Sequence, residues 1–194
     1  MPAAGTLARW RGTACEHLRI AVNLSGRELD NDALIDDIQA TLTAEGISPA
    51  QLEVELTEEI FIQNIEHNLN QLQRLNNLGI NLAIDDFGVG YSSLAYLRDF
   101  PVSSLKIDRS FITNVTDRHD NAVITRAVIN LAHNLGIQVV AEGVETDAHL
   151  RFLTSHRCDF AQGYLISKPL IAADLEQAIA KGILVPALPA QPRL

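Results

Sequence analysis

Apolar residues along the chain follow two different periods. Short runs rich in β-branched residues predict six strands, at 18–25, 52–58, 80–86, 104–108, 137–143 and 161–167. Between them, apolar residues recur at three- and four-residue spacing and predict helices at 32–45, 65–78, 123–135, 147–156 and 172–181. Two of these patterns stop at Gly79 and Gly136, which are typical C-terminal caps. Leu7 and Trp10 predict the end of a further helix before the first strand.

Alternating strands and helices predict a parallel sheet, either open or closed into a barrel. Polar side chains at the strand ends favour the barrel: Asn23, Glu55, Asp85, Asp86, Lys106, Asp108, Glu142 and Gln162. In an open sheet, strands about 4.8 Å apart would spread these groups over roughly 24 Å. A barrel gathers them around one mouth, where barrel enzymes keep their chemistry. We therefore expect an α/β fold, a TIM-type (β/α)8 barrel that is incomplete, with about six of eight strands present and the N-terminal strands missing.

Length and charge narrow the class of protein. The 194 residues suffice for one barrel domain over 1–185, followed by a proline-rich, disordered tail over 186–194. The net charge of −9 argues against binding DNA, RNA or an anionic membrane surface. Charged residues interrupt the most apolar stretch, 122–144, so we expect no membrane segment, and with no secretory signal we expect a cytoplasmic protein. Cys15 and Cys158 are too few for a zinc site or a disulfide framework.

The strand-end residues have the chemistry of a metal site. Asn23, Glu55, Asp85, Asp86 and Glu142 offer hard oxygen ligands without a thiolate or an obvious histidine, a set that suits Mg²⁺ or Mn²⁺. Two adjacent aspartates can divide or bridge a pair of cations, and cation pairs serve phosphodiester cleavage. Lys106 adds a positive charge for a phosphate oxygen or for orienting the attacking water.

Each of these groups also has a simpler structural interpretation. A strand-end carboxylate is often a helix N-cap or a solvated loop residue, and Asn23 can start the next helix. Lys106 and Asp108 can form a rim ion pair of little energy, and Glu142 and Glu145 can belong to a solvated turn. The six histidines fall on helical or loop segments, where packing explains them. The shared placement at strand ends favours the metal site.

Six ordered motifs then point to a family. They are AVNLS (21–25), ELTE (55–58), DDFGVGYSSLAYL (85–97), LKIDRSF (105–111), VVAEGVET (139–146) and QGYLISKPL (162–170). In order and spacing they resemble the motifs of the EAL domain family, and LAHNLGIQ (131–138) resembles the helix before its AEGVE motif. The likeness runs from about Leu18 to about Leu175.

The resemblance implies a modified (β/α)8 barrel that hydrolyses cyclic di-GMP, a bacterial second messenger, to linear pGpG with two Mg²⁺ or Mn²⁺ ions. It implies that Asn23, Glu55 and Asp85 are metal ligands, with Asp85 shared between the ions. Asp86 and Glu142 would complete the second site or hold its water.

Further roles follow from the same resemblance. Lys106 would contact the attacking water or the phosphate, and Glu145, Gln162 and Asp108 would support the metals. Glu58 would anchor the DFGVGYSS loop, which in the family couples dimerisation to metal and substrate binding. We therefore expect a homodimer or oligomer, and an upstream diguanylate cyclase (GGDEF) or sensor domain in the intact protein.

Three departures from the family modify these expectations. The EAL segment, whose glutamate is a metal ligand, has no counterpart in residues 1–17, Val89 replaces the usual threonine, and Ile166 replaces phenylalanine as a packing change. We expect an impaired enzyme whose opened barrel exposes apolar strand edges and interior, so that it oligomerises or is poorly stable. The alternatives are a non-catalytic cyclic di-GMP receptor and a remnant held by a partner domain. Every motif present keeps its carboxylates, which favours the enzyme.

Overall fold

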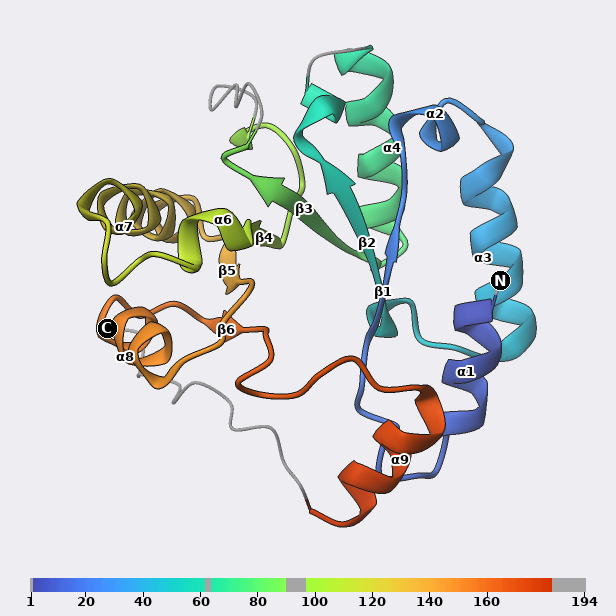
Figure 1. The fold of residues 1–194 in the computed structure, drawn as a ribbon. Helices are drawn as coiled ribbons and strands as arrows, with labels where there is room; N and C mark the ends of the chain where they lie inside the picture. The colour runs from blue at the N-terminus through green and yellow to red at the C-terminus, as the bar shows by residue number, and fades with distance from the viewer. Residues whose placement is uncertain (1, 62–63, 90–96, 183–194) are drawn as a thin grey trace.

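The sheet of this protein is a half-barrel. A computed structural model describes residues 2–61, 64–89 and 97–182. Its six strands are all parallel and neighbour one another in chain order along a curved sheet (Figure 1). They are β1 (Ile20–Asn23), β2 (Leu52–Thr57), β3 (Asn81–Phe87), β4 (Ser104–Ile107), β5 (Gln138–Ala141) and β6 (Phe160–Ala161). The predicted α/β fold, an incomplete barrel with six strands, is confirmed.

Helices follow the strands on the outside of the arc (Figure 1). The α-helices are α1 (Pro2–Trp10), α2 (Gly26–Leu29), α3 (Ala33–Glu45), α4 (Ile65–Asn77), α6 (Arg109–Ile112), α7 (His119–Asn134), α8 (Asp147–Ser155) and α9 (Ala172–Ala180). Two 3₁₀ turns, η1 (Pro49–Gln51) and η2 (Glu58–Phe61), flank β2. The five predicted helices are confirmed, and so is the helix end predicted at Trp10, which closes α1. The one-turn helices α2 and α6 were not predicted, because four residues show no period. Of the described helices, none has the length and apolar character needed to cross a membrane.

The last predicted strand, 161–167, is wrong beyond its first residue. β6 ends at Ala161, and the chain then turns against the loop after β5. Val144 donates its backbone N–H to the Gln162 carbonyl at 3.0 Å, and its own carbonyl accepts from the Leu165 N–H at 3.0 Å. Gly163 lies so close that a Cβ there would meet the Val144 carbonyl oxygen at 2.2 Å. The apolar run therefore packs in a tight turn instead of extending the sheet.

The two faces of the sheet differ in chemistry. The convex face is apolar and lies under the helices, with its central side chains almost completely buried: Val54, Leu56, Leu82, Ile84, Leu105, Ile107 and Val139. Burying each such side chain stabilises the fold by about 1.5–3 kcal/mol. The alternate positions face the concave side and are mainly polar or small: Ala21, Asn23, Glu53, Glu55, Thr57, Asn81, Ala83, Asp85, Ser104, Lys106 and Gln138.

This polarity corrects the expectation of an exposed apolar interior for β1 to β4. Among the strand residues that the structure describes, Phe160 is the one large apolar side chain that is exposed, at 46%. Closed barrels of this type fill their interior with branched apolar side chains. Here most concave positions on β1 to β4 are polar or small. The apolar exceptions lie at the other end of the arc, where Val140 pairs with both Lys106 and the exposed Phe160. The proposed tail, 186–194, and residues 90–96 of the DFGVGYSS loop lie outside the described residues.

Candidate active site

Lys106 lies at the centre of the candidate site. Its Nζ is 2.8 Å from Glu55 Oε1, 3.0 Å from Asp85 Oδ1 and 2.8 Å from Glu142 Oε1. The three carboxylates come from β2, from β3 and from the residue directly after β5, and Lys106 comes from β4 between them. The lysine side chain is only 8% exposed. Residues distant in sequence thus meet around one buried ammonium.

Strand register explains this convergence. In a parallel sheet, directly paired residues point to the same face, and so do residues two positions apart. Asn23 pairs with Glu55, and Leu24 donates its N–H to the Glu55 carbonyl at 2.8 Å. Lys106 pairs with Val140, two residues before Glu142. Asn23, Glu55, Lys106 and Glu142 therefore face the concave side, as does Val140. Asn23 is exposed at the edge strand β1, next to Glu55 but outside the cluster bonded to Lys106.

A β-bulge brings the second aspartate to the same side. Ile84 pairs with Leu105 and Phe87 pairs with Ile107, so β3 uses one residue more than β4 between these pairs. Asp86 takes up the extra residue with a left-handed φ of 51°, which aspartate tolerates better than most residues. A regular strand would turn Asp86 to the convex face. Instead, carboxylate oxygens of Asp85, Asp86 and Glu142 lie within 4.8 Å of one another.

Burial and hydrogen bonding shift the pKa values in this cluster. Burial works against the charge of Lys106, but hydrogen bonds to Glu142, Glu55 and Asp85 outweigh it and raise the lysine pKa. Burial raises the pKa of Glu55, against the opposing effect of Lys106. Burial, followed by the neighbouring charge of Asp85, also raises the pKa of Asp86. Glu55 and Asp86 therefore carry their charges at a cost that comes first from burial and then from neighbouring carboxylates, and a bound cation would relieve it.

Glu58 holds the start of the DFGVGYSS loop. Its side chain is buried, and its Oε1 accepts a hydrogen bond from the backbone N–H of Gly88. Gly88 has a φ of 99°, and a Cβ there would meet the Phe111 ring at 2.8 Å. The carboxylate thus fixes the backbone directly after the bulge, while Val89 is 63% exposed.

The supporting candidates stand at the edge of the cluster. Asp108 caps α6, because its Oδ1 accepts from the Ser110 N–H at 2.9 Å. Burial opposes its ionisation, but the hydrogen bonds from Ser110 outweigh it and lower the Asp108 pKa. The rim ion pair with Lys106 considered above is not formed, since Lys106 bonds to other carboxylates. Glu145 and Gln162 are exposed in the segments that follow β5 and β6, outside the Lys106 cluster.

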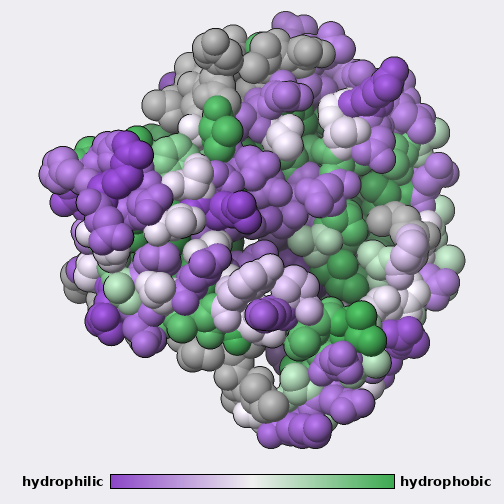
Figure 2. All heavy atoms as spheres, in the orientation of Figure 1, coloured by the Kyte–Doolittle hydropathy of each residue, from purple (hydrophilic) through white to green (hydrophobic). Residues whose placement is uncertain are grey.

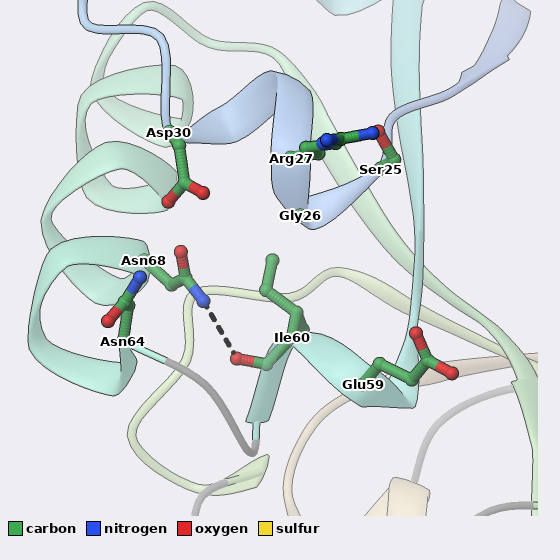
Figure 3. Close-up of a pocket in the computed structure, with 8 residues that line it drawn as sticks. All are labelled: Ser25, Gly26, Arg27, Asp30, Glu59, Ile60, Asn64 and Asn68. Carbon is green, nitrogen blue, oxygen red and sulfur yellow. Dashed lines mark hydrogen bonds between the residues drawn. The ribbon is translucent and has the colours of Figure 1, made fainter.

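Two hollows lie near the sheet. Figure 2 shows one in the middle of the face drawn, inside the arc of strands, with hydrophilic residues gathered along one edge and apolar residues along another. A separate polar pocket of about 360 Å³ lies between α2, η2 and α4 (Figure 3). Inside it, Asn68 Nδ2 donates to the Ile60 carbonyl at 3.0 Å. None of the Lys106 partners lines this second pocket.

Comparison with known proteins agrees with the motifs. The model of the EAL domain family matches residues 3–169. The cyclic di-GMP phosphodiesterase NbdA of Pseudomonas aeruginosa is 45% identical over 162 residues, which are 84% of this chain and 21% of NbdA. The chain spans between 19% and 30% of the length of the curated relatives it matches.

Solved structures of EAL domain proteins are also similar to this chain. The EAL domain of Mycobacterium smegmatis DcpA is 38% identical with a TM-score of 0.88, over 93% of this chain and 82% of that one. The phosphodiesterase PaMucR in complex with c-di-GMP is 37% identical with a TM-score of 0.85, over 90% and 70%. Klebsiella pneumoniae BlrP1, as a manganese and cyclic di-GMP complex, is 30% identical with a TM-score of 0.78, over 88% and 44%. The chain belongs to the EAL domain family.

Proposed function

We propose that this chain carries a phosphodiesterase site that hydrolyses cyclic di-GMP to linear pGpG. The observation that carries the proposal is the meeting of Glu55, Asp85 and Glu142 around Lys106 on the concave face, with Asp86 beside them. The names of NbdA and PaMucR add support, because both are phosphodiesterases. Since the substrate is an intracellular messenger, the proposal includes a cytoplasmic protein.

The donor set fits divalent cations. Glu55, Asp85, Asp86 and Glu142, with Asn23 at the edge, would hold Mg²⁺ or Mn²⁺ through oxygen atoms, the ligands that these hard ions prefer. A bound pair of cations would supply an activated water and neutralise the charge of the phosphodiester. A manganese complex of BlrP1 is consistent with this assignment.

The other residues act on the substrate and on the frame of the site. Lys106 offers its ammonium to a phosphate oxygen or to the attacking water, because its head lies among the carboxylates. Asp108, Glu145 and Gln162 would support the cluster from its rim. Glu58 would hold the DFGVGYSS loop through Gly88 and couple the site to a second copy of the chain in a homodimer or oligomer.

Two features of this chain would lower its turnover. The Glu-Ala-Leu sequence that gives the family a further metal-binding carboxylate does not occur among the 194 residues. With fewer carboxylate ligands a cation is held less tightly, so we propose that the isolated chain is impaired. Val89 keeps the volume of the usual threonine but lacks its hydroxyl, which weakens the coupling of the loop to the site.

The test is an assay of cyclic di-GMP and pGpG by chromatography, with Mn²⁺ or Mg²⁺ present. We expect slow, metal-dependent formation of pGpG that Glu55→Gln abolishes. Glu53→Gln is the matched control, because Glu53 lies on the same strand and face but pairs with Arg19 at 2.9 Å. Thermal stabilisation by cyclic di-GMP without formation of pGpG would show a receptor instead. If cyclic di-GMP is neither cleaved nor stabilises the protein, both functions are refuted.

A further inference from the structure

The ammonium of Lys106 occupies the point on which the predicted metal ligands converge. Lysine has three N–H donors and no acceptor, and here three carboxylates at 2.8–3.0 Å use all of them. We infer that Lys106 is a built-in counter-cation that competes with divalent cations for Glu55, Asp85 and Glu142. It would thereby set the cation concentration at which the site loads. The inference rests on the metal site of the proposed function and adds a role for Lys106 before substrate arrives.

Distances make the competition direct. Mg²⁺ binds carboxylate oxygen at about 2.0–2.1 Å, so a cation on the same oxygen atoms would lie within about 5 Å of Nζ. The lysine charge and a divalent charge repel strongly at such a separation in a partly buried site. The ammonium therefore opposes the binding of a cation to these carboxylates, and withdrawal of the lysine head favours it. The strand backbone can stay in place, because the four-carbon stem of lysine allows the head to move alone.

The balance of charges shows that Lys106 competes with cations for the carboxylates but does not prevent cation binding. It neutralises one negative charge, whereas Glu55, Asp85, Asp86 and Glu142 together offer four. The cluster therefore still attracts cations. In the described part of the chain, Asp86 is not among the carboxylates paired with Lys106, and it is exposed on the bulge. Asp86 would thus remain available to a cation while the ammonium is bonded to Asp85 and Glu142.

The same contacts predict a stabilising role for Lys106 in metal-free protein. Glu55, Asp85 and Glu142 are all largely shielded from solvent, with side-chain exposures of 12%, 17% and 19%. Without the ammonium these partly buried carboxylates would repel one another, a strongly destabilising arrangement. Divalent cations would supply the missing charge. Removal of the lysine head should therefore make stability more dependent on metal.

Lys106→Met separates the two roles, because methionine is a similarly long side chain without charge or donors. The 194-residue protein, stripped of metal, is titrated with Mn²⁺ at fixed pH by calorimetry, with no substrate. We expect Lys106→Met to bind Mn²⁺ at least about tenfold more tightly than wild type, since the repulsion of the ammonium is gone. We also expect a lower metal-free Tm and a larger rise of Tm on adding Mn²⁺. Arg19→Met is the matched control, because it removes one positive charge paired with Glu53 outside the cluster.

A measurement on wild-type protein covers the case in which Lys106→Met does not fold. NMR of ¹⁵N-labelled protein should show one slowly exchanging lysine NH₃⁺ signal. This signal should shift or disappear as Mg²⁺ is added, and the midpoint of the change should equal the midpoint of Mg²⁺ binding. Equal or weaker Mn²⁺ binding by Lys106→Met, or an NH₃⁺ signal that stays unchanged with Mg²⁺ bound, overturns the inference and leaves the proposed metal site standing. Absence of cation binding by wild type and variant alike overturns both.

Discussion

The indole N–H of Trp10 donates a hydrogen bond to Glu176 Oε1 at 2.7 Å and joins α1 to α9, the first and last helices that the structure describes (Figure 1). Trp10 is buried, and with Leu7 and Ala4 it packs α1 into the core. No residue of α9 is fully buried, so its attachment depends on partly buried contacts by Leu175 and Ile179 and on this hydrogen bond. The pair therefore fastens the C-terminal helix to the N-terminal one.

Glu176→Ala should weaken this attachment. The loss leaves a buried indole N–H without its acceptor, which costs about 1–2 kcal/mol. Urea unfolding, followed by the fluorescence of Trp10, the single tryptophan, measures the loss directly. Arg9→Ala is the control, because its ion pair with Glu176 is 63% exposed on the arginine side and exposed pairs contribute less than about 1 kcal/mol. Equal stability of Glu176→Ala and wild type would contradict the prediction.

Glu58→Ala should free the Gly88 amide. The Glu58 carboxylate accepts the Gly88 N–H, and a charged acceptor makes such a bond worth about 1.5–3 kcal/mol. Hydrogen exchange at the Gly88 amide should accelerate in Glu58→Ala and stay slower in Glu58→Gln, which keeps a carbonyl oxygen. The neighbouring Glu59→Ala, on an exposed side chain, serves as the control. Unchanged exchange in Glu58→Ala would show that another contact holds Gly88.

Asp86→Asn should weaken cation binding, while Asp108→Asn should not. Asp86 shares the acidic cluster with Asp85 and Glu142, whereas Asp108 is engaged as the cap of α6, a role that asparagine also fills. We expect Mn²⁺ affinity to fall on the order of tenfold or more in Asp86→Asn and to change little in Asp108→Asn. Calorimetric titration with Mn²⁺ gives both values. Equal losses in the two variants would place Asp108 among the ligands.

Gly163→Ala should destabilise the fold strongly. A Cβ at this position would lie 2.2 Å from the Val144 carbonyl oxygen and 2.3 Å from its nitrogen, and backbone atoms cannot move aside as a flexible side chain can. Overpacking of this kind costs about 1–3 kcal/mol or more. Gly5→Ala is the contrasting substitution, because Gly5 lies within α1 with open space around it and alanine favours a helix by about 0.5–1 kcal/mol. Thermal unfolding should therefore move in opposite directions for the two variants.

Much of the fold follows from the sequence because its signals are local. The strand runs at 52–58 and 80–86 alternate apolar and polar residues, and their buried face matches β2 and β3. The helix pattern that ends at Gly79 is equally regular, and α4 ends two residues earlier. The strand predicted at 161–167 is wrong because the backbone of Val144, about twenty residues earlier, holds this segment in a turn through hydrogen bonds and a close contact with Gly163. Contacts of that kind leave no periodic signal.

The site shows the same division. Its members could be named from strand ends, since parallel strands present their carboxyl ends at one rim. The bulge that turns Asp86 to the concave face could not, because it depends on the register between β3 and β4. The pairing of Lys106 with three carboxylates depends on register between four strands. The alternation of apolar and polar residues, as in Glu53 and Glu55 of β2, does indicate a polar concave face. The comparison with closed barrels, whose interior is filled with apolar side chains, led to the opposite expectation.

Cys158 should be inert to alkylation while the protein is folded. Burial raises the pKa of its thiol to about 12, so almost no thiolate, the reactive form, exists near pH 8. In a Cys15→Ser variant, iodoacetamide should label Cys158 only after unfolding in urea.

The raised pKa of Cys158 also fixes the sign of a pH effect on stability. The unfolded thiol, with an ordinary pKa of 9.0, loses its proton first as the pH rises, while the folded thiol keeps it until about 12. The unfolded state thus binds fewer protons in this window, and linkage then lowers the free energy of unfolding as the pH rises above 9. Cys158→Ala should remove that share of the alkaline decline, although it leaves a small cavity. The free energy of unfolding is measured by urea unfolding at pH 8 and at pH 10. If it falls by the same amount in Cys158→Ala and in wild type, the Cys158 thiol does not have the raised pKa that its burial predicts.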